Sequence, residues 1–178
     1  MKMRKTAIIL AALAASCGPS APGGPSSSHF FDLEAYFDGE IGRLGVRQSV
    51  EKTITLNGET QQQRGEWNAE EELDGFKELK INRPAWRDQY EVDSLRGADG
   101  QLEGLRYAAR DSSLRIREVE IDMKEGAVEE IRVEKHIKNT VVYFHQELSY
   151  RPAEGYRIRR VQKVPLTKRS ELEIEVRF

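Results

Sequence analysis

The sequence is short of the residues from which most metal and enzyme sites are built. It has one cysteine and three histidines among 178 residues. A single cysteine excludes an intramolecular disulfide, and His29, His136 and His145 are not spaced as zinc ligands are. The sequence contains no Gly-x-Ser-x-Gly motif, which excludes the usual nucleophile elbow. We therefore expect no metal, no cofactor and no enzymatic activity.

Long hydrophobic runs are also missing. The most apolar stretch, residues 6–15, has about ten residues, whereas a helix needs roughly 20 to cross a bilayer. Lys2, Arg4 and Lys5 precede this stretch, and small residues follow it. A basic head, a short apolar run and small residues form the layout of a secretory signal that is removed. We assign residues 1–16 to this signal peptide.

The one cysteine lies at the end of the signal, in segment 13–17, which reads Leu-Ala-Ala-Ser-Cys. This segment resembles the lipobox of bacterial lipoproteins, although Ala14 stands where that family usually has leucine. The resemblance implies a diacylglycerol thioether on Cys17, cleavage before it and acylation of the freed amine. Gly18 is not the aspartate that retains some of these proteins at the inner membrane, so the resemblance favours the outer membrane. The alternative is an ordinary secretory signal that leaves Cys17 as a free thiol.

The chain after the signal divides into two parts. Residues 17–29 begin with the cysteine and then consist almost wholly of Gly, Pro, Ala and Ser, which predicts a flexible linker. Residues 30–178 have the length of one globular domain, and neither a repeat nor a second linker divides them. The sequence therefore predicts a single domain on a lipid tether.

Two periods of hydrophobicity run through this domain. Periods of three and four predict a helix over 30–44, with Ser28 as its N-cap, and a second helix over 69–80, capped by Asn68. Alternation predicts strands at 50–56, 59–64, 102–108, 114–122, 128–137, 140–150, 156–164 and 172–178. Short turns between the strands favour antiparallel neighbours. We expect an α+β fold: a curved antiparallel sheet of about six to nine strands with one or two helices on one face, of which a half-barrel is one form.

Two local details refine the predicted sheet. The strand at 114–122 changes phase between Ile116 and Val119, which predicts a β-bulge between them. A two-residue turn at Lys138-Asn139 would leave His136 and His145 roughly 13 Å apart along the hairpin. At that distance the two imidazoles cannot share a metal ion.

Charge of one sign is not in large excess. Loss of the signal removes three of the 28 basic residues, which leaves 25 against 30 acidic ones and a net charge of about −5. This balance argues against general nucleic-acid binding. The largest local excess of positive charge places Arg157, Arg159 and Lys163 on one strand face. They would suit an anionic headgroup, an acidic glycan or a partner protein, or else pair with the glutamates of 171–175.

Three aromatic residues are further candidates for a binding surface. Trp86 and Tyr90 follow the irregular stretch 81–85, where Pro84 prevents regular strand pairing, and Trp67 precedes the second predicted helix. An exposed Trp in a loop serves as a binding anchor, whereas a buried one caps the core. Both readings are open at this point.

These observations leave three hypotheses for the function. The first is a noncatalytic envelope lipoprotein that serves as an interaction or assembly module. The second follows from a likeness to the half-barrels that carry lipoproteins or lipids across the periplasm, and it requires a cavity that holds an acyl chain. The third is an inhibitor of a secreted enzyme. Helices that fill the concave face with residues such as Phe37, Ile41, Leu73 and Phe76 would leave no room for the lipid of the second hypothesis.

Overall fold

The computed structural model describes residues 30–178, so the predictions for the signal peptide, Cys17 and the linker lie outside the described residues. This part contains two α-helices, one short 3-10 helix (η1) and nine strands. The elements are α1 (Leu33–Leu44), β1 (Val46–Leu56), β2 (Glu59–Asn68), α2 (Ala69–Lys77), η1 (Pro84–Trp86), β3 (Tyr90–Arg96), β4 (Leu102–Ala109), β5 (Ile116–Lys124), β6 (Ala127–Lys138), β7 (Tyr143–Arg151), β8 (Gly155–Lys163) and β9 (Ser170–Arg177). None of the helices within 30–178 is long and apolar enough to cross a membrane.

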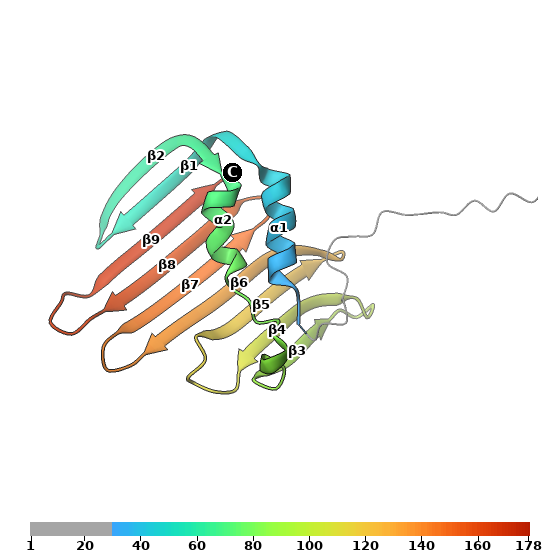
Figure 1. Cartoon of the computed structure of the whole chain (residues 1–178). Helices are drawn as coiled ribbons and strands as arrows, with labels where there is room; N and C mark the ends of the chain where they lie inside the picture. Colours follow the sequence, from blue (N-terminus) through green and yellow to red (C-terminus); the bar gives the residue numbers. More distant parts are fainter. Residues whose placement is uncertain (1–29) are drawn as a thin grey trace, which may run out of the picture.

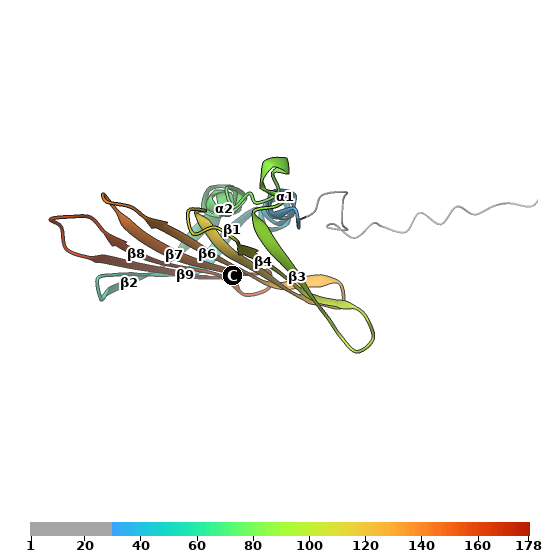
Figure 2. The ribbon, with the colours of Figure 1, turned by 90° about the horizontal axis from the view of Figure 1, so that it is seen from below.

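The nine strands form one antiparallel sheet in the order β2-β1-β9-β8-β7-β6-β5-β4-β3. Strands β3 to β9 follow each other as hairpins, and β1 then pairs with the last strand, β9. The sheet is open, with β2 and β3 as its edges (Figure 1). Both helices lie on one face, here called the inner face, while the outer face carries no helix (Figure 2). The predicted α+β class and the one-sided helices are thus confirmed.

The first helix begins later than predicted. Its N-cap is Asp32, whose carboxylate accepts a hydrogen bond from the amide of Ala35 at 3.1 Å. Ser28, the predicted cap, lies outside the described residues, and the helix starts at Leu33. Phe30 is buried ahead of the helix, with its ring edge-on to core tyrosines. Phe30 therefore contributes to the core from the non-helical residues ahead of α1.

The second helix begins as predicted and ends early. The side chain of Asn68 accepts a hydrogen bond from the amide of Glu70 at 3.0 Å, which confirms the predicted cap. The helix ends at Lys77 rather than at residue 80. Leu79 and Ile81 are both buried because the chain is no longer helical there, so residues two apart face the core.

All eight predicted strands are present, and one strand was missed. β3 is an edge strand in which only Tyr90 is buried, and its apolar alternation is short: Tyr90 and Val92 are in phase, but Leu95 is not. The predicted bulge is confirmed, because the register of β5 against β6 shifts between Ile116 and Glu118.

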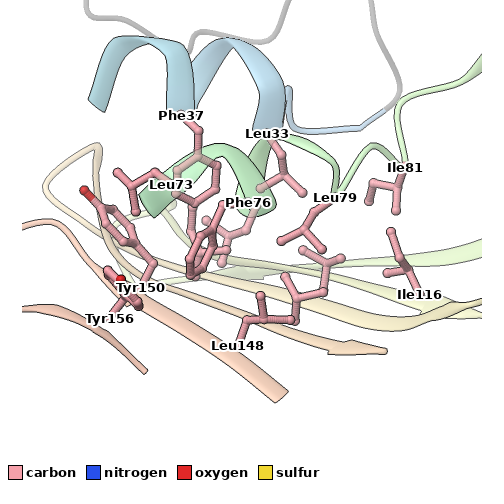
Figure 3. Close-up of a cluster of buried hydrophobic side chains, with 14 of the residues drawn as sticks. Leu33, Phe37, Leu73, Phe76, Leu79, Ile81, Ile116, Leu148, Tyr150 and Tyr156 are labelled. Atoms are coloured by element: carbon pink, nitrogen blue, oxygen red, sulfur yellow. The ribbon is translucent and has the colours of Figure 1, made fainter. Parts of the chain in front are cut away.

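The core lies between the helices and the inner face of the sheet (Figure 3). Phe37, Leu73 and Phe76 are at most 1 % exposed, and Ile41 packs against them while partly exposed. The Phe37 ring lies 5.1 Å from the rings of Phe76 and Tyr150, between centroids. The helices therefore fill the middle of the inner face with side chains.

Candidate functional site

The aromatic candidates do not form one surface. Trp67 in β2 is 4 % exposed and packs against the ring of Phe178 at 4.9 Å. Tyr90 in β3 is 3 % exposed, and its hydroxyl donates to a backbone carbonyl of β5 at 3.0 Å. Because β2 and β3 are opposite edges of the sheet, these two residues lie far apart in the strand order. Trp86 is half-buried at the end of η1, with the Arg83 guanidinium 4.7 Å from its ring centroid.

The basic run lies on the outer face, where glutamates surround two of its three members. Arg157 donates hydrogen bonds to Glu173, and Arg159 lies 3.5 Å from Glu147 and 3.6 Å from Glu173. Lys163 is exposed at the end of β8, and no carboxylate of residues 30–178 lies within ion-pair distance of it. Lys163 therefore differs from the two arginines with which the sequence grouped it, because it alone of the three has no acidic partner among the described residues.

The rest of the outer face follows the same pattern of paired charges. A shallow hollow of about 480 Å³ lies across β5 to β8. In it, Arg132 contacts Glu120 at 3.0 Å and Asp122 at 2.7 Å, and the hydrogen bond from Arg106 lowers the pKa of Glu118. Exposed ion pairs of this kind stabilise a protein by about 0–1 kcal/mol each. Five glutamates and three arginines line the hollow, so it carries a net negative charge of about −2 and its arginines already have acidic partners.

The predicted separation of the histidines was wrong. The loop between β6 and β7 has four residues, 139–142, rather than two, so His136 pairs directly with His145. Their ring centroids lie 5.9 Å apart, and Nε2 of His145 is 3.3 Å from Glu147. Across residues 30–178, no group of three or more His, Cys, Asp or Glu side chains is placed to hold a metal ion.

The open part of the inner face was not predicted as a site. Strands β1, β9 and β8 extend beyond the helices at the end where β1 finishes (Figures 1 and 2). Ile54, Ile174 and Ile158 are cross-strand neighbours in one row across β1, β9 and β8. In the next row, Leu56 pairs with Leu172, which in turn pairs with Arg160 of β8. Seven residues make up this surface, which we call the inner patch: Ile54, Leu56, Lys135, Ile158, Arg160, Leu172 and Ile174. Gln146, which lies between Lys135 and Arg160 in the register, is buried.

Two cations of the inner patch lack a carboxylate partner. Neither Lys135 nor Arg160 has an acidic group of the described chain within ion-pair distance, and the buried Nε of Arg160 makes no hydrogen bond there. Burial lowers the pKa of Lys135; Glu78 opposes this effect, whereas Arg160 and Arg115 add to it. Half-buried cations without counter-ions favour an anionic group. The inner patch therefore combines apolar side chains with a positive potential.

A signal for this patch was present in the sequence. Ile158 and Arg160 are two residues apart, and so are Val133 and Lys135, so each cation shares a strand face with an apolar residue. Within the run 156–163, the sequence pointed to Arg157 and Arg159 as binding residues, but both form ion pairs on the outer face. A cation on the same strand face as the apolar residues, such as Arg160 beside Ile158, was the better indicator of the inner patch.

Comparison with known proteins found no matching family model, no similar curated protein and no similar solved structure.

Proposed function

We propose that the protein is a noncatalytic interaction module of the bacterial cell envelope, held at a membrane by lipid on Cys17. The inner patch is the surface that binds its protein partner. The observation that carries this proposal is the coincidence of apolar side chains with the unpaired cations Lys135 and Arg160 on one rigid sheet. The lipobox-like segment 13–17, followed by Gly18, favours attachment to the outer membrane.

The surroundings of the acidic residues support a role without catalysis. The carboxylate of Asp111 accepts a hydrogen bond from the amide of Ser113 at 2.7 Å, which lowers its pKa and holds a turn. Glu72 accepts hydrogen bonds from Lys52 at 2.6 Å and from the hydroxyl of Tyr156 at 2.5 Å. Both carboxylates therefore have structural partners.

The packing under the helices favours a docking module over a lipid carrier. A carrier needs an enclosed apolar cavity, and Phe37, Leu73 and Phe76 occupy the corresponding space. A protein partner needs only an accessible surface, which the inner patch offers: Leu56, for example, is 48 % exposed.

Replacement of Cys17 tests the anchor. Cells fed a palmitate analogue should incorporate the label into the wild-type protein and not into Cys17→Ser, because the thioether needs the sulfur. Fractionation of the same cells should move the variant out of the outer-membrane fraction. Equal labelling of both chains would overturn the lipid anchor and would leave the inner patch untouched.

Photo-crosslinking tests the docking surface. A photoreactive amino acid in place of Leu56 lies on the inner face, whereas one in place of its neighbour Thr55 lies on the outer face. We expect Leu56 to give a discrete protein adduct in cells and Thr55 to give none. The adduct should disappear with Arg160→Glu, which reverses a central charge of the patch.

The two positions form a matched pair, since they occupy the same strand and differ only in the face they present. Adducts of equal yield from both, or an adduct that survives Arg160→Glu in a folded protein, would remove the support for the inner patch. Circular dichroism of the variant establishes that it is folded.

A further inference from the structure

Two neighbouring hairpins end together at one end of the sheet. Strand β7 pairs with both β6 and β8, so the loops 139–142 and 164–169 lie at the same end. In Figure 1 both loops project at the lower left, beyond the helices. Five residues at this end are named here as the tip cluster: Lys138, Val141, Tyr143, Lys163 and Leu166.

The tip cluster presents large apolar side chains to solvent. Leu166 is fully exposed and Val141 is 69 % exposed. The side chain of Asn139 accepts a hydrogen bond from the amide of Val141 at 2.8 Å, and the Thr167 amide and hydroxyl both donate to the carbonyl of Val164. Leu166 has a φ of 67°, a conformation that is strained for leucine. The loops thus hold exposed apolar residues in defined positions, although the domain gains no burial from them.

Basic residues flank these apolar side chains. Tyr143 is 37 % exposed and lies between Lys138 and Lys163 in the cross-strand register. No carboxylate of residues 30–178 forms an ion pair with either lysine, nor with Lys168 in the adjoining loop. On the same outer face, Arg157 and Arg159 are both paired. Lys138 and Lys163 therefore lie beside the apolar tips with no acidic partner among the described residues.

We infer that the tip cluster is a contact site for an anionic lipid surface. A tyrosine between two lysines suits the membrane interface, because its ring enters the headgroup region while the ammonium groups remain at the phosphates. Leu166 and Val141 would enter the acyl boundary from the two loops. Since the chain beyond the signal has a net charge of about −5, attraction to an anionic bilayer has to come from a local cluster. This contact is independent of the inner patch and of acylation at Cys17.

Vesicle binding tests this inference on residues 17–178 carrying Cys17→Ser, so that no acyl chain contributes. Binding to vesicles that contain phosphatidylglycerol should exceed binding to pure phosphatidylcholine and should weaken with salt. Each cation at such a surface contributes roughly a fivefold change, so Lys138→Gln with Lys163→Gln should lower the partition coefficient about 25-fold. Leu166→Asp should lower it by at least about tenfold.

Matched variants elsewhere on the chain serve as controls. Lys124→Gln removes an exposed lysine at the opposite end of β5, and Leu95→Asp changes a leucine that is 65 % exposed on β3. Both should leave vesicle binding unchanged. Equal binding to the two kinds of vesicle, or equal losses in the control and tip variants, would overturn the lipid contact. Failure here would not bear on palmitate labelling of Cys17 or on crosslinking from the inner patch.

Discussion

Phe76→Ala should lower the free energy of unfolding by about 4 kcal/mol, within the range for deletion of a buried aromatic side chain. Phe76 is 1 % exposed, and its ring lies 5.1 Å from Phe37, 6.0 Å from Tyr150 and 5.6 Å from Tyr156, between centroids. It therefore joins both helices to β7 and β8 (Figure 3). Removal of the ring leaves a cavity at this junction that the rigid sheet cannot close.

Urea denaturation of the wild type and the variant measures this loss. Phe76→Leu should cost less, about 1–2 kcal/mol, because most of the buried volume is kept. Leu166→Ala provides the control, since Leu166 is fully exposed and its truncation should change stability by less than about 0.5 kcal/mol. A loss below about 1 kcal/mol for Phe76→Ala would mean that the helices do not pack on the sheet as described.

Stability falls steeply above about pH 10, because the fold holds its tyrosines in the neutral form. Burial raises the pKa of Tyr90 from 10.0 to about 12, and burial also raises the pKa values of Tyr36, Tyr107, Tyr150 and Tyr156. The unfolded chain releases these protons near pH 10, whereas the folded chain retains them. The folded state therefore binds more protons in this window and loses stability as the pH rises.

The expected size of this effect is large. Each tyrosine held neutral costs about 1.4 kcal/mol for every pH unit above its unfolded pKa, so the four tyrosines other than Tyr107 together cost on the order of 5 kcal/mol at pH 11. Neighbouring carboxylates add to the effect of burial, since the Tyr150 hydroxyl donates to Glu40 and the Tyr156 hydroxyl donates to Glu72. Below about pH 9 these tyrosines contribute no pH dependence.

Urea denaturation as a function of pH, together with tyrosinate absorbance, measures this behaviour. Tyr156→Phe removes one of the titrating groups, so its stability should fall with a shallower slope above pH 10 than that of the wild type. Unchanged stability between about pH 9 and 11 would contradict the prediction. So would the ionisation of buried tyrosines near pH 10 in the folded protein.

Local order in this protein was predictable because it depends on neighbours along the chain. Asn68 caps α2 through the amide of Glu70, two residues away, and the phase change after Ile116 marks the bulge in β5. Alternation likewise identified eight of the nine strands in the described chain. The missed strand, β3, has one buried residue, Tyr90, and its alternation breaks at Leu95, so the period is too short to stand out.

Pairings across strands were less predictable, because they depend on loop length. A loop of four residues in place of two moved His136 opposite His145. The same kind of uncertainty applied to the basic run: the face of Arg157 and Arg159 was evident, but the glutamates that pair with them come from β7 and β9. The run alone therefore could not show whether the two arginines were free to bind a ligand.

The sequence by itself determined the α+β class, eight of the nine described strands and which side chains share a strand face, because periods of two and 3.6 residues are properties of the local backbone. Only the tertiary structure decided how much of the inner face the helices cover. That coverage depends on where α2 ends and how far β8 and β9 run beyond it, and it leaves Lys135 and Arg160 without carboxylate partners within the described chain. Burial and charge pairing are collective quantities, set by residues that are distant in the chain and adjacent in the fold.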